Sequence, residues 1–432
     1  TTVEEMAAAF KQMGTPFIVG HPGGESVELM EAAKAQGMRF ILMKQEVAGA
    51  MLAATWGEIT GSPGVCLSTR GPGATNMVNG IAHAFLDRAP LIAITDRYSS
   101  PEQEIGIRQR LDHQAIMQPI VKWSTAIDAQ FIKQQLRRAV RIATAYAPGP
   151  VHFDLPQSET KKPSGTSQNL PELMPNYYHP KPDPRGIENA VTMIKAADRP
   201  VLLVGLGTLW DNACPAMVAL AEHLGAPVLT TSKCKGAMPE DHLLRAGCII
   251  GGLIERDLVS KADLIITIGL DAVELQPKGW PYTTKVLSFA NHPSLDALVA
   301  CNEEVIGALD PLLTVIVENV PQRSGWGFDA AKTFRDRVHT ALDTPATGLS
   351  PQRVVECARA IMPRNTIATC DAGASRLLVV QKWQSYGPRE FLTSNGLADP
   401  SELIPQIRKA IARGFDRTVA LQSITTYPAN VL

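Results

Sequence analysis

The chain has 432 residues, of which 45% are hydrophobic and 19% charged, a composition typical of a soluble globular protein with about three domains. The formal net charge is −1 and the basic residues are dispersed, so neither nucleic acid nor a membrane surface is expected as a partner. The seven cysteines include no Cys-x-x-Cys pair, which argues against a zinc site or a disulfide framework and favours a cytoplasmic location.

Helices and strands alternate over the first part of the chain. An amphipathic helix is predicted over 3–13 in place of a signal peptide, and no apolar run reaches the roughly 18 residues of a membrane span. The predicted strands are 16–20, 40–43, 64–68, 90–95 and 152–156, with helices over 46–60 and 73–86. Apolar strands between helices indicate a parallel sheet covered on both faces. Residues 1–157 are therefore predicted to form an α/β domain.

The rest of the chain repeats this pattern after a proline-rich stretch, 158–186, which is predicted to be a linker. A second α/β domain is predicted over 187–325, with strands at 200–205, 227–230, 264–268 and 285–289. A linker helix over 326–348 then leads to a third α/β domain, 349–432, whose first helix is capped by Ser350 and runs to 361. We therefore expect three doubly wound parallel-sheet domains, of which the third is incomplete.

Three turns of the first domain combine glycine or acidic residues with the start of a helix. They are His21-Pro22-Gly23-Gly24, Lys44-Gln45-Glu46 and the segment from Ser68 to Asn76, which contains Gly71-Pro72-Gly73. Ligands bind at the carboxyl ends of the strands of an open parallel sheet, where glycines permit close approach and helix N-termini donate N–H groups. The alternative is that the glycines only form tight turns and that Glu46 only stabilises a helix start.

The order of these motifs resembles the acetolactate synthase large subunit and its thiamine-diphosphate-dependent relatives. The likeness continues through Gly149-Pro150-Val151, the segment 199–205 and Leu349-Ser350-Pro351-Gln352, so that it covers nearly the whole chain. It implies that the three domains are pyrimidine-binding, central and diphosphate-binding. It also implies that each active site joins two subunits, in a homodimer or homotetramer.

The resemblance assigns the cofactor-binding residues. Glu46 matches the glutamate that hydrogen-bonds the aminopyrimidine and activates thiamine diphosphate for attack on a carbonyl carbon. The segments that line the pyrimidine in the family correspond to Pro22, Gly23, Gly24, Gly73 and Asn76. The loop that receives the diphosphate corresponds to Gly373, Ala374 and Ser375. The implied cofactors are thiamine diphosphate and Mg²⁺.

The family's metal-binding motif, Gly-Asp-Gly, does not occur in the sequence, so no metal ligand is predicted. The segment that ends at Ala398 precedes this motif in relatives, whereas the segment from Asp399 resembles the final helix of the domain. Either a large segment between 398 and 399 is missing from the printed sequence, or the protein has lost it. Real loss would favour a non-catalytic homologue that binds a nucleotide or serves as a partner subunit.

Other departures concern the substrate and the central domain. Arg70 and Arg97 stand where relatives have other residues, and each is a candidate for binding a substrate carboxylate, although a solvated surface role fits equally well. Gly205-Leu206-Gly207 is half of a Gly-x-Gly-x-x-Gly pattern, because Trp210 occupies the third position. This pattern favours neither FAD in the central domain nor a nicotinamide oxidoreductase. His113, His152 and His292 lack metal-ligand spacing, and no role is assigned to them.

We therefore expect a thiamine-diphosphate-dependent enzyme that carries out C–C bond chemistry on a small 2-oxo acid or related carbonyl donor. The acetolactate-synthase-like version of this reaction transfers an aldehyde or ketone group to an acceptor. The alternatives are a decarboxylase or C–C lyase of the same superfamily, or the non-catalytic homologue. The sequence does not identify the substrate or the acceptor.

Overall fold

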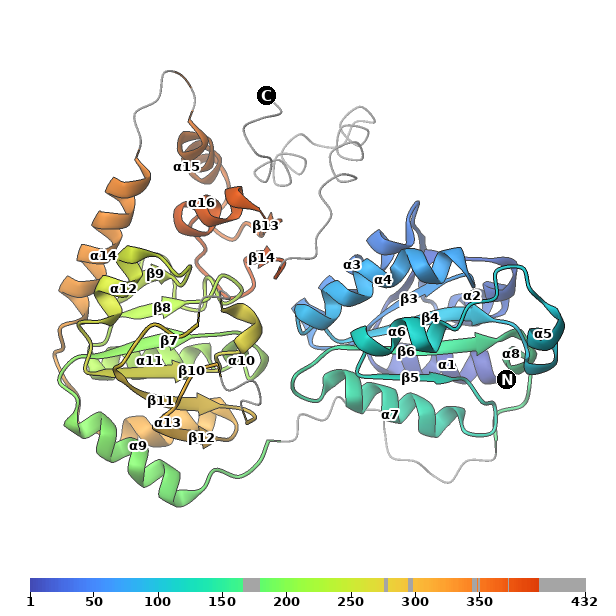
Figure 1. The fold of residues 1–432 in the computed structure, drawn as a ribbon, viewed down its shortest axis with the longest axis horizontal. Helices are drawn as coiled ribbons and strands as arrows, with labels where there is room; N and C mark the ends of the chain where they lie inside the picture. The colour runs from blue at the N-terminus through green and yellow to red at the C-terminus, as the bar shows by residue number, and fades with distance from the viewer. Residues whose placement is uncertain are drawn as a thin grey trace. The chain divides into compact units, whose positions relative to one another are not determined.

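The computed structural model describes residues 1–165, 179–275, 279–293, 298–343, 348, 350–371 and 373–395 (Figure 1). The chain divides into two compact units, Thr1–Tyr178 and His179–Leu432. Both units are built on parallel sheets with helices on their faces, so the predicted α/β class is confirmed. Within the described residues, no helix is long and apolar enough to cross a membrane.

The first unit contains a six-stranded sheet in the order β2-β1-β3-β4-β6-β5, in which every pair of neighbours is parallel. Its strands are β1 (Phe17–His21), β2 (Arg39–Leu42), β3 (Gly64–Ser68), β4 (Leu91–Arg97), β5 (Trp123–Ala126) and β6 (Pro150–Pro156). The strands β3 and β6 are buried along their whole length, as their apolar runs predict. The edge strand β5 is short and only half-buried, and it was not predicted from the sequence.

Helices cover both faces of this sheet, and each face has its own hydrophobic core (Figure 1). The helices are α1 (Thr2–Gln12), η1 (Gly24–Ser26), α2 (Val27–Ala35), α3 (Glu46–Thr60), α4 (Pro72–Leu86), α5 (Ser100–Ile105), α6 (His113–Met117), η2 (Gln118–Ile120), α7 (Ile132–Thr144) and α8 (Gln157–Thr160). Helices α1, α2 and α7 pack against side chains such as Phe153. Helices α3 and α4 pack against the opposite face, against side chains such as Cys66.

Helices α3 and α4 approach each other closely because small residues face each other. A Cβ atom on Gly80 would lie 2.6 Å from the Cβ of Ala50 and 2.7 Å from the carbonyl oxygen of Val47, so only glycine fits at position 80. A Cβ atom on Gly20 would lie 1.8 Å from the carbonyl oxygen of Leu67. The contact at Gly80 sets how closely α3 approaches α4, and the contact at Gly20 sets how closely the end of β1 approaches β3.

The second unit contains a six-stranded parallel sheet in the order β12-β11-β10-β7-β8-β9. Its strands are β7 (Pro200–Val204), β8 (Val228–Thr230), β9 (Arg245–Cys248), β10 (Leu264–Ile268), β11 (Lys285–Ala290) and β12 (Glu303–Ile306). Its helices are α9 (Pro184–Ala196), α10 (Gly207–Trp210), α11 (Cys214–Leu224), α12 (Leu253–Val259), η3 (Ala272–Glu274), α13 (Leu309–Asn319) and α14 (Gly327–Leu342). The strand order changes direction between β7 and β10, as in other doubly wound sheets.

A small subdomain follows within the second unit. It consists of α15 (Pro351–Ile361), β13 (Ala368–Cys370), α16 (Ala374–Lys382) and β14 (Phe391–Thr393), with β13 and β14 parallel. The hydroxyl oxygen of Ser350 accepts a hydrogen bond of 3.2 Å from the N–H of Arg353, which caps α15 as predicted. Its core includes Cys248 of the edge strand β9. The described part of this third predicted domain is incomplete, and the junction at 398 and 399 lies outside the described residues.

Candidate active site

The turns that follow β1 and β2 lie side by side at the carboxyl edge of the first sheet. The N–H of Met43 donates a hydrogen bond of 2.8 Å to the carbonyl oxygen of Gly20, and Nδ1 of His21 lies 2.9 Å from the carbonyl oxygen of Met43. The register of β1 and β3 pairs His21 with Ser68, the last residue of β3. The predicted binding segment Pro22, Gly23 and Gly24 follows β1 at this edge and is half-buried to exposed.

Glu46 is the first residue of α3, and its side chain is nearly buried, with the residue 9% exposed. The amide nitrogen Nδ2 of Asn76, on α4, donates a hydrogen bond of 3.2 Å to Oε2 of Glu46. A Cβ atom on Gly73 would lie 3.4 Å from Oε1 of Glu46 and 2.8 Å from Cγ2 of Thr69. The structure therefore brings together the predicted residues Glu46, Gly73 and Asn76, and glycine at position 73 leaves room beside the carboxylate.

The turn between β3 and α4 has a conformation that requires glycine. Gly71 has φ +67° and ψ −111°, a region of backbone space that residues with a side chain rarely adopt. Pro72 then occupies the first turn of α4, where its missing N–H is not needed. The N–H of Gly71 donates a hydrogen bond of 3.1 Å to Nε2 of His113, so α6 holds this turn in place.

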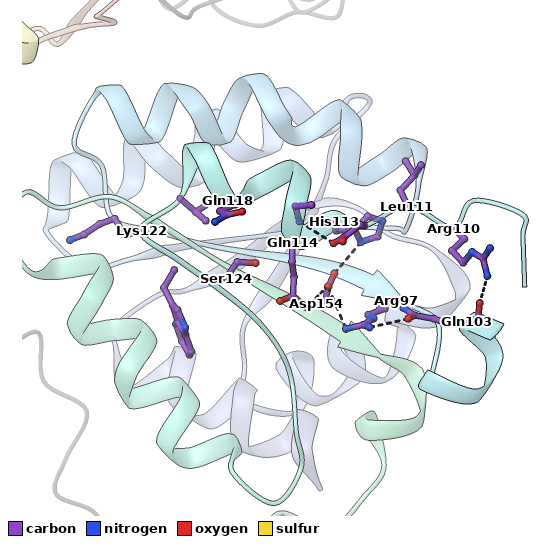
Figure 2. Close-up of a pocket in the computed structure, with 14 residues that line it drawn as sticks. Arg97, Gln103, Arg110, Leu111, His113, Gln114, Gln118, Lys122, Ser124 and Asp154 are labelled. Atoms are coloured by element: carbon purple, nitrogen blue, oxygen red, sulfur yellow. Dashed lines mark hydrogen bonds and ion pairs between the residues drawn. The ribbon is translucent and has the colours of Figure 1, made fainter.

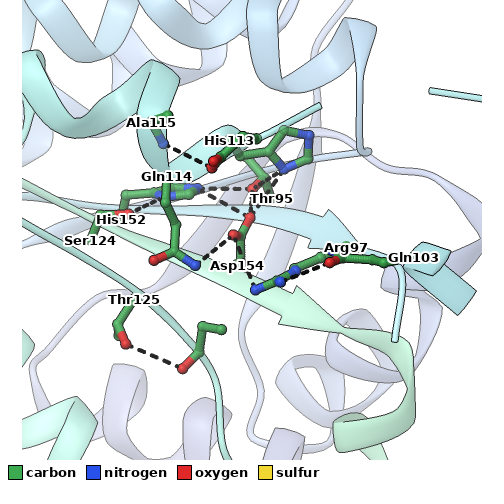
Figure 3. A network of polar contacts seen from close by, with 12 residues as sticks. Thr95, Arg97, Gln103, His113, Gln114, Ala115, Ser124, Thr125, His152 and Asp154 are labelled. Carbon is green, nitrogen blue, oxygen red and sulfur yellow. Dashed lines mark hydrogen bonds and ion pairs between the residues drawn. The ribbon is translucent and has the colours of Figure 1, made fainter. Parts of the chain in front are cut away.

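His113 belongs to a buried polar network centred on Asp154 of β6 (Figure 3). Oδ1 of Asp154 accepts hydrogen bonds of 3.0 Å from the hydroxyl of Thr95 and from Nδ1 of His113, and Oδ2 accepts one of 3.1 Å from Gln114. Because Nε2 of His113 accepts from Gly71, its proton must be on Nδ1. Burial alone would raise the pKa of Asp154, but the hydrogen bond from His113 and the nearby polar groups lower it below its ordinary value.

His152 extends the network toward β5. Its Nε2 lies 2.8 Å from the hydroxyl of Thr95, and its Nδ1 lies 2.8 Å from the hydroxyl of Ser124. Burial lowers the pKa of His152 to about 4, so the ring is neutral near pH 7. Since Thr95 donates its proton to Asp154, Nε2 of His152 donates to Thr95 and Ser124 donates to Nδ1.

No role was predicted for His113 or His152 from the sequence, although β6 contains a signal that indicates this network. Residues of a strand alternate between its two faces. Phe153 packs in the core beside α7, so His152 and Asp154, which flank it, face the other side, toward α6. Two polar residues at alternate positions of a strand that is otherwise apolar indicate a buried polar cluster.

A cavity of about 870 Å³ adjoins the network, lined by groups from β4, α6 and β6 (Figure 2). Arg97 lines this cavity, where its guanidinium donates a hydrogen bond of 2.9 Å to Gln103 and lies 3.8 Å from Oδ2 of Asp154. The guanidinium of Arg70 instead lies 3.8 Å from the centre of the Tyr98 ring, and Arg70 is not among the cavity-lining residues. Of the two predicted substrate arginines, Arg97 therefore lines this cavity and Arg70 does not.

The predicted diphosphate loop lies between β13 and α16 in the second unit. Gly373 has φ +133°, and α16 begins at Ala374, so this turn leads into the N-terminus of a helix, the kind of position at which phosphate groups bind in other proteins. The side chains of Ala374 and Ser375 lie outside the described residues. Among the described residues, no group of three or more His, Cys, Asp or Glu side chains could hold a metal ion.

The turn after β7 holds a carboxylate at the place where a nucleotide phosphate would bind. Oε2 of Glu274 accepts a hydrogen bond of 2.9 Å from the N–H of Leu206, and a Cβ atom on Gly205 would lie 2.6 Å from the same oxygen. Burial raises the pKa of Glu274 to about 7. The N–H donor that a dinucleotide would need already has a protein acceptor, which is a physical reason to disfavour FAD at this turn.

Two segments of the chain match known protein families. Residues 1–116 match the family described as thiamine pyrophosphate enzyme, N-terminal TPP binding domain. Residues 187–313 match the family described as thiamine pyrophosphate enzyme, central domain. These segments correspond to the domains predicted as pyrimidine-binding and central.

Curated relatives and solved structures are similar over most of the chain. The probable acetolactate synthase large subunit of Methanocaldococcus jannaschii is 30% identical over 421 residues, which cover 91% of this chain and 70% of that protein. The acetolactate synthase large subunit of Parasynechococcus marenigrum is 30% identical over 95% of this chain and 69% of its own length. The structure of benzoylformate decarboxylase from Polynucleobacter necessarius has a TM-score of 0.77 at 19% identity and covers 95% of this chain and 77% of that one, which is a likeness of fold.

Proposed function

Because the chain belongs to the thiamine pyrophosphate enzyme family, we propose that it transfers an aldehyde or ketone group from a small 2-oxo acid or related carbonyl donor to an acceptor. The observation that carries this proposal is the nearly buried carboxylate of Glu46, held by Asn76 and flanked by Gly73. Two relatives named acetolactate synthase large subunit support the transferase version of the reaction.

The surroundings of Glu46 fit the pyrimidine ring of thiamine diphosphate. The hydrogen bond from Asn76 fixes one carboxylate oxygen, and the missing side chain at Gly73 leaves space beside the other. When bound, the cofactor supplies the nucleophilic carbon and the electron sink for cleaving a bond next to a carbonyl. The role of Glu46 is to hold and share a proton with a pyrimidine nitrogen, for which its place on a rigid helix start is suited.

Other residues have proposed roles in binding. Arg97 is placed in the cavity beside Asp154, where its guanidinium can pair with the carboxylate of a 2-oxo acid. The N–H groups that follow Gly373 would receive the diphosphate. Mg²⁺ is proposed from the family resemblance alone, since the described residues offer no cluster of ligands for it.

Three further features of the proposal concern the whole protein. A homodimer or homotetramer follows from the resemblance to enzymes whose active sites join two subunits. A cytoplasmic location is supported by the cysteines, all of which are free thiols. A decarboxylase or C–C lyase is the alternative reaction, because the fold is shared with a decarboxylase, and a non-catalytic homologue is the alternative if the metal motif is truly lost.

The proposal is tested by the intact mass of the protein and by titration with thiamine diphosphate and Mg²⁺, followed by turnover of 2-oxo acids. We expect saturable binding, and we expect Glu46→Gln to lower turnover by about 100-fold or more, the usual effect of losing a proton-transfer group. Glu58→Gln, the same change near the other end of α3, is the matched control and should retain activity. A mass equal to 46.6 kDa together with no cofactor binding would instead support the non-catalytic homologue.

A further inference from the structure

The second unit contains a cavity of about 620 Å³ whose lining is rich in positive charge. It lies beside the edge strand β9 and helices α14, α15 and α16. None of its lining residues belongs to the turn at Gly373. Its cationic lining residues are Arg245, Arg335, Arg359, Arg364 and Lys382. We call this cavity the α14–α15 cavity.

Carboxylates neutralise only part of this charge. Within the lining, Oε2 of Glu240 lies 2.8 Å from Nη1 of Arg245, and Oε1 of Glu356 lies 2.9 Å from Nζ of Lys382. Glu240 is shared, because Nζ of Lys235 also bonds to it. The lining of five cations and these two carboxylates therefore carries an excess of positive charge.

Arg335 and Arg359 bond to backbone carbonyls in the part of the chain that the structure describes. Nη1 of Arg335 donates to the carbonyl oxygen of Leu243 at 3.1 Å, and Nη2 of Arg359 donates to that of Pro363 at 2.6 Å. Burial lowers the pKa of Arg335, and the charge of Arg245 lowers it further. The guanidinium groups of Arg245 and Arg335 therefore repel each other.

Two of these arginines are buried with unsatisfied donors. Arg245 is 7% exposed and Arg359 is 9% exposed. Nη2 of Arg245 and Nη1 of Arg359 have no hydrogen-bond partner among the described residues. Leaving a charged donor buried without an acceptor is unfavourable, so the arrangement is suited to a ligand that brings negatively charged oxygen atoms.

The remainder of the lining is suited to the organic part of such a ligand. Phe334 and Val338 of α14 and Met362 after α15 present apolar surface. The volume lies within the range of small-molecule sites, about 300–1,000 Å³. Arginine is the side chain that best matches the geometry of a phosphate group, since its planar fork can donate two parallel hydrogen bonds.

We propose that the α14–α15 cavity binds a small phosphorylated ligand, with the phosphate held by Arg245 and Arg359 and with Arg364 at the opening. The apolar residues Phe334 and Met362 contact the organic part of the ligand. This site is additional to the proposed active site and does not depend on the proposed reaction.

Calorimetric titration tests the proposal with inorganic phosphate, adenosine 5′-monophosphate and adenosine as probes. The protein is first saturated with thiamine diphosphate and Mg²⁺, so that the cofactor's own phosphate site is not measured. We expect saturable binding of phosphate or the monophosphate but not of adenosine. Tighter binding of the monophosphate than of phosphate assigns a phosphate ester as the ligand, and equal binding assigns free phosphate.

The variants Arg359→Gln and Arg364→Gln should each weaken binding about ten-fold or more, the effect of losing a charge-assisted hydrogen bond. Arg364 is largely exposed and pairs with Asp241, so its replacement leaves the fold intact even if Arg359→Gln does not fold. Arg337→Gln on α14 is the matched control, because Arg337 pairs with Asp257 and does not line the cavity. Absence of saturable binding, or equal weakening by Arg337→Gln, would overturn the proposal.

A second measurement locates the bound phosphate. Phenylglyoxal modifies accessible arginines, and peptide mapping shows which of them a ligand protects. Phosphate should slow modification of Arg364 and leave that of Arg337 unchanged. Equal rates of modification of Arg364 with and without phosphate would place the ligand elsewhere and refute the assignment.

Discussion

Replacing His113 by phenylalanine tests whether the Asp154 network supports the active-site turn. The change keeps an aromatic ring but removes the hydrogen bonds of 3.0 Å to Asp154 and 3.1 Å from the N–H of Gly71. Each buried group left without its partner costs about 1–3 kcal/mol, so we expect a loss of about 2–6 kcal/mol. For domains of 150–250 residues about 1 kcal/mol corresponds to about 2–4 °C, so the melting temperature of the first unit should fall by on the order of 5–20 °C.

Two further variants separate the hydrogen bonds of His113. An asparagine amide can occupy the place of Nδ1 and donate to Asp154, whereas a glutamine amide reaches the place of Nε2 and can accept from Gly71. His113→Asn should therefore disturb the turn that leads to Gly73 and Asn76. We expect the two variants to lose similar free energies of unfolding, but we expect His113→Asn to have a lower kcat than His113→Gln.

The assays are thermal unfolding and steady-state turnover of a 2-oxo acid with saturating cofactor. His113 would be a positioning residue, since it acts on Glu46 only through the turn at Gly71 and Gly73. A melting temperature of His113→Phe within about 1 °C of the wild type would refute the calculation. A loss of only about 1 kcal/mol in the free energy of unfolding already lowers the melting temperature by about 2–4 °C. Equal kcat for His113→Asn and His113→Gln would refute the link to the turn.

Three other predictions concern pH, packing and substrate. The folded-state pKa of His152, about 4, lies below its ordinary 6.5, so the free energy of unfolding should fall by about 3 kcal/mol as pH drops from about 6.5 to about 4. His152→Gln should reduce this acid sensitivity, and parallel pH profiles of unfolding for the two proteins would contradict the prediction. Gly80→Ala should destabilise the protein by about 1–3 kcal/mol in urea unfolding, because the new methyl group meets the Val47 carbonyl, whereas Asn79→Ala should not. Arg97→Gln should raise KM for the 2-oxo acid about ten-fold or more with little change in kcat, and an equal effect of Arg108→Gln would argue against a carboxylate site.

The central elements of the fold were predictable from the sequence because several signals agree on them. The prediction of a helix over 46–60 matches α3 residue for residue, since an acidic start, a run of small and apolar residues and the left-handed glycine at position 61 mark both ends. The edge strands β5, β9 and β12 were not predicted. They are short and include polar or charged residues such as Arg245, which an edge position tolerates.

The candidate site was predictable where its residues belong to short sequence motifs that occur in the same order as in the family. Glu46, Gly73 and Asn76 were identified from the resemblance, and the contact between Glu46 and Asn76 is observed. The network of His113, His152 and Asp154 was not predicted, because only the tertiary fold brings His113 on α6 to His152 and Asp154 on β6. Spacing along the chain carries no signal for such a cluster beyond the alternation within β6.

The close packing of α3 against α4 limits where this enzyme can vary. Position 80 has room only for glycine, because the first turns of the helix that begins at Glu46 pack against it at Val47 and Ala50. A mutational library aimed at new substrates should therefore leave the facing positions Ala50 and Gly80 unchanged, because a larger side chain there destabilises the packing of the two helices. Diversity placed on the segment from α5 to α6, whose side chains Gln103, Arg110 and Gln114 line the larger cavity, would change the lining of the proposed substrate cavity without altering the helix that carries Glu46.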